Sequence, residues 1–83
     1  DAIDRTLTEL TGFYRDVLSI QTGSGAQVIN EDLRPQIAAL ARKSTAESTL
    51  HRIDALLACR TALEGNVAPL LAVEAALIGL VEG

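Results

Sequence analysis

The stretch NVAPLLAVEAALIGLV, residues 66–81, decides the fold of this 83-residue chain. Asn66 and Pro69 are typical of a helix start, because asparagine caps free amide groups and proline fits a first turn, where its missing donor costs little. After Pro69 the segment is apolar almost all the way round a helix, and its large aliphatic residues are Leu70, Leu71, Val73, Leu77, Ile78, Leu80 and Val81. We therefore expect a helix over residues 67–82 that is covered on several faces.

Either this last helix is central to the domain, or a partner protein covers it. In a four-helix bundle from a chain this short, each helix normally keeps one side in water. We therefore favour a partner and take the seven aliphatic residues as the candidate interface. The same surface also allows the isolated domain to form a homodimer. We expect Leu77→Asp to disrupt folding or association, because it places an unpaired charge on a buried face.

Glu74 is the polar exception within the last helix. A carboxylate buried there without a partner is costly, so Glu74 is either exposed or paired with an arginine, for which Arg15 and Arg60 are the candidates. In such a pair, Glu74 fixes the register of the helix against its neighbours. Together with Asn66 and Pro69, it has a structural role in this motif.

The first helix and the loop after it are visible in the spacing of apolar residues. From Ile3 to Ile20 these residues recur at steps of three and four, which predicts a helix over residues 2–21. The glycine-rich segment 21–26 then predicts a loop, because glycine releases the backbone from helical dihedrals.

A second helix is expected over residues 31–43. Asn30 is a good N-cap, since its side chain can accept a hydrogen bond from a backbone amide. Pro35 lies in the first turn or so of this segment, where a missing amide donor is tolerated.

A third helix is expected over residues 45–64. Ser44 and Glu47 have the spacing of a capping box, in which each side chain satisfies the other residue's backbone amide. Gly65 is a natural helix end. The sequence therefore predicts a single all-α domain over residues 1–83, a small bundle of four or five helices.

Composition limits what such a domain does. Hydrophobic residues make up 48% of the chain and aromatic residues only 2%, so aliphatic side chains must fill the core. The formal net charge of -4 repels phosphates, and we expect no direct contact with nucleic acid. No apolar run is long enough for a membrane span, and the single cysteine excludes an intramolecular disulfide. We therefore expect a soluble domain excised from a larger cytoplasmic protein.

The single histidine, His51, is the candidate for metal binding or catalysis. Glu47 and Asp54 share its helix face, but one imidazole with two ordinary carboxylates is a poor zinc site. Ser48 with His51 and Asp54 cannot surround a reacting carbonyl from adjacent turns of one helix. No glycine-rich phosphate loop is present. We therefore expect no catalytic residue, no metal and no cofactor, and we place Cys59 in the core as an inert side chain.

Three segments resemble the bacterial clamp-loader subunits of DNA polymerase III. Residues 66–77 resemble the pattern Asn-x-Asn-Pro-x-Leu-x-Leu-Glu-x-Leu-Leu near the C-terminus of these subunits, most like that of the actinobacterial delta-prime subunit. Residues 13–18, Phe-Tyr-Arg-Asp-Val-Leu, look like the aromatic-Arg-Asp-apolar segment of the family's first collar helix, and residues 30–32 look like its next helix start. Ala68 and Ala76 depart from the pattern, which leaves the related ATPase (gamma/tau) subunit as an alternative.

The resemblance implies a non-catalytic collar domain. The collar holds together a pentamer that opens the sliding clamp and places it on primed DNA during replication. Other clamp-loader subunits, bound through their C-terminal domains, are then the expected partners. An unrelated helical dimerisation or regulatory module is the alternative, since it accounts for the same aliphatic surface.

Overall fold

The computed structural model describes residues 1–25 and 27–83; Ala26, the last residue of the predicted loop, lies outside the described residues. The described residues contain no strand and form four α-helices and one short 3-10 helix: α1 (Ala2–Thr22), η1 (Glu31–Leu33), α2 (Arg34–Lys43), α3 (Ala46–Glu64) and α4 (Pro69–Glu82). The predicted all-α bundle of four helices is confirmed. No helix in this part of the chain has both the length and the hydrophobicity needed to cross a membrane.

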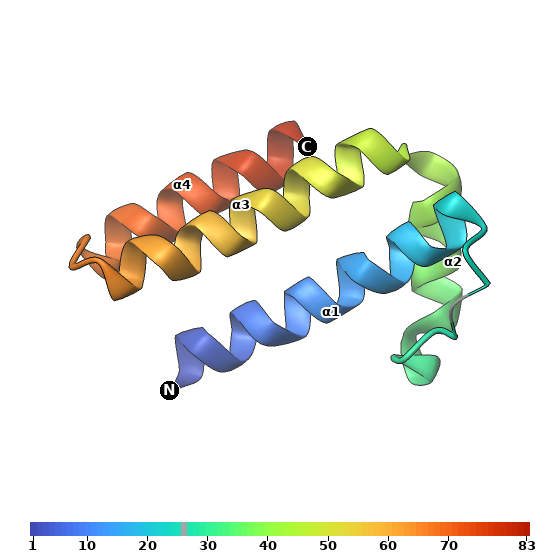
Figure 1. The fold of residues 1–83 in the computed structure, drawn as a ribbon, viewed down its shortest axis with the longest axis horizontal. Coiled ribbons are helices and arrows are strands. Elements are labelled where there is room, and N and C mark those ends of the chain that lie inside the picture. The colour runs from blue at the N-terminus through green and yellow to red at the C-terminus, as the bar shows by residue number, and fades with distance from the viewer. Residues whose placement is uncertain (26) are drawn as a thin grey trace.

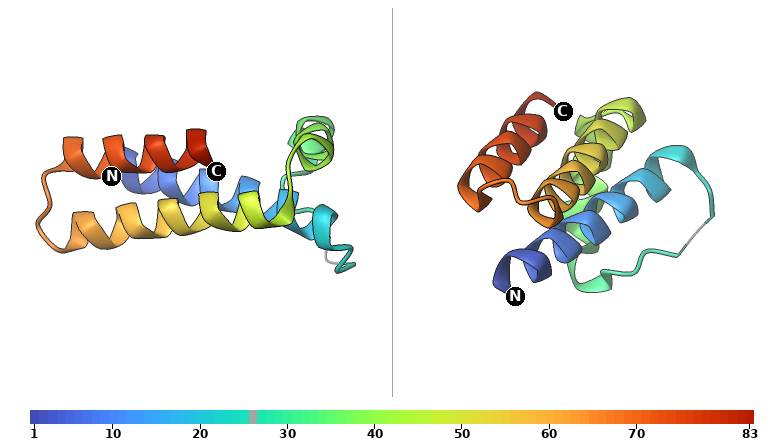
Figure 2. Two further views of the ribbon diagram at one scale, coloured as in Figure 1. Left: turned by 90° about the horizontal axis from the view of Figure 1, so that it is seen from above. Right: turned by 60° about the vertical axis from the view of Figure 1, so that its left-hand side comes forward.

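The central helix of the fold is α3. It lies between α1 and α4, and α2 crosses the end of α1 (Figure 1). Seen from above, α1 and α4 lie on the same side of α3 (Figure 2), so the three helices form a shallow trough with α3 as its floor. Because α4 occupies one edge, it is not the central helix of this domain.

Two separate clusters of apolar side chains hold this arrangement together. The larger one joins α1, α3 and α4, and its buried members are Leu7, Leu56, Cys59, Ala72 and Ala76. The smaller one joins α1 to α2 through Val17, Val28 and Ile37. Phe13 packs on the smaller cluster and Tyr14 on the larger one, and their rings meet edge to face with centroids 5.3 Å apart. These two aromatic residues therefore connect the two clusters.

The domain exposes more surface than its size requires. Its accessible surface is 5393 Å², whereas a globular protein of this size exposes roughly 4,800 Å². Its Cα radius of gyration is 13.1 Å, against about 12 Å for a compact domain of this length. An open trough of three helices accounts for both differences.

The first helix extends one residue further than expected. It ends at Thr22, and Gly23 follows in the left-handed conformation, with φ of 62° and its amide donating to Ile20 O. Gln21 is therefore helical rather than part of the loop. Its amide nitrogen donates to Ala41 O and Ser44 Oγ, at 3.3 and 3.0 Å, and its carbonyl oxygen accepts from Thr49 Oγ1 at 2.7 Å. This network fastens the end of α1 to α2 and α3.

The predicted helix over residues 31–43 has two parts, η1 and α2. Pro35 has no amide hydrogen, so it cannot donate the usual α-helical bond to Glu31 O. That oxygen instead accepts from Arg34 N–H, which gives the tighter 3-10 turn. The helix becomes regular only from Arg34 onward.

The N-cap of α3 lies one residue after the position expected for it, Ser44. Thr45 is the N-cap of α3, and its Oγ1 accepts from Ser48 N–H at 3.0 Å. Ser44 instead ends α2, where both its amide and its hydroxyl donate to Leu40 O. Since the hydroxyl is used there, the prediction that Ser44 caps the next helix is wrong.

Asn66 follows Gly65, the C-cap of α3, and belongs to the end of that helix rather than to the start of α4. It has a φ of 71°, a left-handed conformation that asparagine tolerates better than most residues. Val67 N–H then donates to Ala62 O at 3.0 Å, the long hydrogen bond of a Schellman motif. The N-cap position of α4 is Ala68, which makes no side-chain capping bond, and Pro69 is the first helical residue. The prediction that Asn66 caps the last helix is therefore wrong.

Close contact between α3 and α4 depends on Gly79. A Cβ atom placed on Gly79 would lie 2.6 Å from Ala55 Cβ, so the two helices could not keep their present separation. A Cβ on Gly12 of α1 would meet only Asn30 Nδ2, at an ordinary 3.7 Å. The same glycine-to-alanine change therefore has opposite physical consequences at the two positions.

We expect Gly79→Ala to lower the free energy of unfolding by about 1–2 kcal/mol, because the overlap outweighs the gain in helix propensity. Gly12→Ala is the matched control and should raise it by up to about 1 kcal/mol, since only the propensity gain remains. Urea unfolding followed by circular dichroism measures both. A stabilising Gly79→Ala would show that α4 moves away from α3 at little cost.

Candidate partner-binding surface

The aliphatic residues of α4 point mostly away from the core. Five of the seven candidate interface residues are more than half exposed, from 55% at Leu77 to 84% at Val81. The other three of these five are Leu70, Leu71 and Ile78. Val73 and Leu80 are partly buried against the larger core cluster. The seven residues thus divide into an exposed set and a set that the domain already uses.

Small residues make this exposure possible. Ala72 and Ala76 are the buried residues of α4, and Gly79 lies directly against Ala55 of α3. These three positions are spaced four and three residues apart, so they form one stripe along the helix. Because small side chains take the inward stripe, most of the large ones are left exposed.

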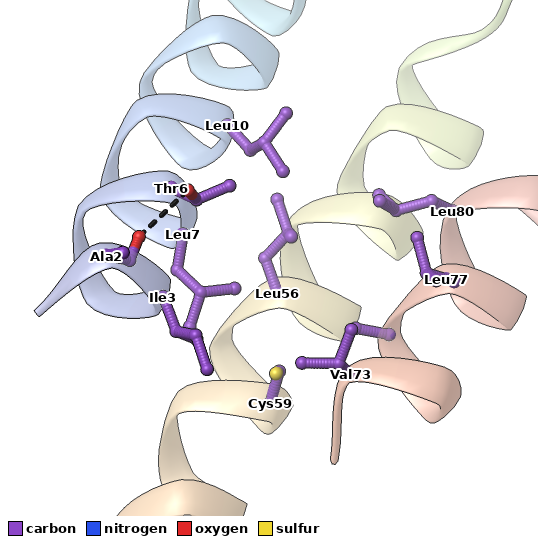
Figure 3. A pocket seen from close by; sticks show the side chains of 11 residues that line it. Ala2, Ile3, Thr6, Leu7, Leu10, Leu56, Cys59, Val73, Leu77 and Leu80 are labelled. Atoms are coloured by element: carbon purple, nitrogen blue, oxygen red, sulfur yellow. Dashed lines mark hydrogen bonds between the residues drawn. The ribbon is translucent and has the colours of Figure 1, made fainter. Parts of the chain in front are cut away.

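An apolar groove runs along the trough between α1 and α4. It has a volume of about 270 Å³, and Figure 3 shows its lining residues. Leu56 and Cys59 of α3 form the floor, with Ile3 and Leu7 on one side and Leu77 on the other. The hydroxyl of Thr6, which also lines the groove, donates to Ala2 O at 2.9 Å within its own helix. The groove therefore offers room for aliphatic side chains and little hydrogen bonding.

Arg52 holds the end of α4 in place. Its Nε donates to Leu80 O at 2.9 Å, and its guanidinium carbon lies 5.9 Å from the centre of the Tyr14 ring. A cation at the C-terminal end of a helix is favoured by the helix dipole. Although it is charged, the Arg52 side chain is partly buried and joins three helices.

Asp16 is a structural residue that the apolar pattern did not reveal. It is 2% exposed, and its carboxylate accepts from the backbone amides of Ile29 and Asn30 at 2.9 and 2.8 Å. It also accepts from Asn30 Nδ2 at 2.8 Å. Asn30 therefore precedes η1 as expected, but its side chain donates to Asp16 instead of capping the helix. A carboxylate beside Val17 on the inner face of a helix was the available signal.

The same hydrogen bonds change the acidity of Asp16. Burial on its own raises the pKa of this carboxyl, but the donors from Ile29 and Asn30, with a smaller effect of Arg34, lower it by more. The pKa of Asp16 thus lies below its ordinary value, and the group is held as a carboxylate.

Glu74 is exposed and lies among the outward aliphatic residues of α4. Within residues 1–25 and 27–83 no ion pair involves it. Arg60 pairs with Asp4 at 3.2 Å, and Arg15 is exposed on α1. The expected pair with Arg15 or Arg60 is therefore not formed inside the domain, because Glu74 lies on the exposed face of α4. Glu74 does not fix the register of α4.

The residues considered for metal binding or catalysis are placed as they are in an ordinary helical domain, on the surface or in the core. Glu47, His51 and Asp54 are all exposed on α3, and the described residues contain no cluster of three or more potential metal ligands. Cys59 is buried beside Leu7 and Leu56, which confirms its place in the core.

Comparison with known protein families gives a match over nearly the whole chain. A family model described as DNA polymerase III, delta subunit, C terminal, matches residues 1–81. The matched range takes in α1, α2, α3 and nearly all of α4. No curated protein matches the chain, and no solved structure does.

Proposed function

Because the chain belongs to the family formed by the C-terminal domains of DNA polymerase III delta subunits, we propose that it is the assembly domain of a clamp loader. It has no catalytic role of its own and binds the C-terminal domains of other clamp-loader subunits. In the assembled loader it helps to hold the pentamer that places the sliding clamp on primed DNA. The parent protein thus acts in the cytoplasm as part of DNA polymerase III.

The observation that carries this proposal is the outer face of α4. Leu70, Leu71, Leu77, Ile78 and Val81 are all more than half exposed on one edge helix. Monomeric proteins rarely leave a contiguous aliphatic surface of this kind in water, and such surfaces commonly mark protein interfaces. The apolar groove between α1 and α4 continues this surface into the trough.

A collar domain of the delta-prime type is the finer form of the proposal. The segments 13–18 and 30–32, which resemble that family, are joined in this fold by the bonds from Ile29 and Asn30 to Asp16. The two segments therefore meet at one buried carboxylate. This contact supports the resemblance more strongly than the spacing of the segments in the sequence does. The collar of the ATPase (gamma/tau) subunit remains the second form of the same function.

Light-scattering chromatography of the domain, alone and mixed with other clamp-loader C-terminal domains from the same source, tests the proposal. We expect a mixed complex with at least one of them, the ATPase subunit's domain being the first to try. A domain that stays a monomer with all of them contradicts the proposal. A homodimer that ignores them identifies an independent dimerisation module instead.

A further inference from the structure

A second groove lies between α1 and α3, and no residue of α4 lines it. It has a volume of about 340 Å³, and its lining residues are Thr8, Thr11, Gly12, Arg15, Leu57 and Arg60. The groove is open because α1 presents two threonines and a glycine at this place. On its α3 side, Leu57 is 43% exposed, although it is aliphatic.

The threonines of this groove have little hydrogen-bonding capacity left. Thr8 Oγ1 donates to Asp4 O and accepts from Arg60 Nη2, at 3.0 and 2.9 Å. Thr11 Oγ1 donates to Leu7 O at 2.7 Å. These threonines therefore have no free donor for a small polar ligand, because both hydroxyl groups already donate within the domain. The aliphatic residue that the groove offers to a ligand is Leu57.

Arg15 is the uncompensated charge at this groove. The other arginine, Arg60, is paired with Asp4 at 3.2 Å. The guanidinium of Arg15 is exposed, and among the described residues it makes no hydrogen bond or ion pair. One unpaired cation next to an aliphatic surface suits a ligand that brings one anion together with apolar side chains.

We propose that this groove binds an amphipathic helix of a neighbouring protein subunit, whose aliphatic side chains cover Leu57 and whose carboxylate pairs with Arg15. The inference rests on the proposed assembly function and adds a second binding surface, with its own chemistry, to the face of α4. Nucleic acid fits less well, because one unpaired arginine on a chain of net charge -4 gives phosphates little attraction.

The domain itself shows what such a helix looks like. On α4, Glu74 lies between the exposed Leu70 and Leu77, and the helix carries no cation. Two copies that pair through α4 bring the two Glu74 carboxylates together without a counter-charge, which disfavours a symmetric homodimer. An acidic aliphatic helix and a basic groove on one domain instead favour head-to-tail contacts with two different neighbours.

The test uses two synthetic amphipathic helices of about 20 residues that differ at one position. Both carry leucines at helical spacing, and one has glutamate and the other lysine between them. We expect the glutamate peptide to bind the wild-type chain about tenfold more tightly, with NMR shifts at Arg15 Nε–H and the Leu57 methyl groups. Arg15→Glu should reverse this preference, and Arg15→Gln should remove it.

Arg5→Glu is the matched control, since Arg5 is exposed on α1 but does not line the groove. It should leave the preference for the glutamate peptide unchanged. Equal binding of the two peptides, an effect of Arg5→Glu as large as that of Arg15→Glu, or NMR shifts confined to α4 would each overturn the proposal. A single-stranded oligonucleotide that shifts the Arg15 and Leu57 signals would overturn it in favour of a phosphate site. If this proposal fails, the mixed complex expected in light scattering can still form, so the two proposals can be tested separately.

Discussion

Replacement of Asp16 by alanine is expected to lower the free energy of unfolding by about 3 kcal/mol or more. The change leaves the amides of Ile29 and Asn30 and the Asn30 side chain without their charged acceptor. Hydrogen bonds to charged groups contribute about 1.5–3 kcal/mol each, although such contributions are not additive. A domain of this length has a total stability of about 4–12 kcal/mol, so the loss is a large fraction of it. Urea unfolding measures the difference.

Asp54→Ala is the control for this prediction, because it makes the same change at an exposed position of α3. It should alter the stability by less than about 0.5 kcal/mol. If Asp16→Ala has an effect equally small, the three hydrogen bonds do not hold the segment before η1 against α1.

The stability of the domain should also fall in acid because of Asp16. The folded-state pKa of Asp16 lies below its ordinary value of 3.8, so the unfolded chain binds the proton more tightly. The stabilisation is complete well above that value and is lost as the pH falls through the folded-state pKa. Arg34 also lowers the pKa of the exposed Glu31, and measurement at high salt screens that pair. In Asp16→Asn, the acid-dependent part of the stability curve should be flatter.

The helices could be predicted from the sequence because they depend on spacing along the chain. Steps of three and four between Ile3 and Ile20 identify α1 to within one residue at its end. The predicted ends of α2 and α3, at residues 43 and 64, are also those of the structure. The capping roles were less accessible, because Ser44, Thr45 and Asn66 can each cap a helix or end one. Which role each takes depends on the direction of the chain after the turn, and that is set by packing.

The contacts of polar side chains could not be predicted in the same way. Asp16 binds Ile29 and Asn30, which lie 13 and 14 residues away across a loop. No periodicity encodes such a distance. The pairing proposed for Glu74 failed for a related reason, since the packing of α4 through Ala72 and Ala76 leaves Glu74 on its exposed face. The apolar pattern, which covers several sides of this helix, did not determine which side packs against α3.

The exposed face of α4 could have been located more sharply from its small residues. The pattern of large aliphatic side chains showed only that the helix is apolar on several sides. Ala72, Ala76 and Gly79 mark the side that faces α3, because only small residues let two helices approach closely. Most of the large residues on the remaining sides are then exposed, and Leu77 is among them.

Leu77→Asp is expected to leave the isolated domain folded and to weaken its association with a partner protein by about 100-fold or more. Leu77 is 55% exposed, so of the two effects expected from the sequence, on folding or on association, the structure favours the effect on association. In the isolated domain the new carboxylate reaches water, and the stability should change by less than about 1 kcal/mol. At an interface the same carboxylate loses its water without gaining a counter-charge, which costs several kcal/mol in addition to the lost apolar contact.

Leu50→Asp is the matched control, because Leu50 of α3 is exposed to a similar extent, 49%, and lines neither groove. Isothermal titration calorimetry with the partner domain gives the affinities, and thermal unfolding shows whether each variant is folded. Loss of binding in both variants would indicate a general effect of charge rather than a contact at α4. Unchanged binding by a folded Leu77→Asp would place the interface elsewhere, since a carboxylate among the exposed aliphatic residues of α4 cannot be buried against an apolar partner without a large loss of affinity.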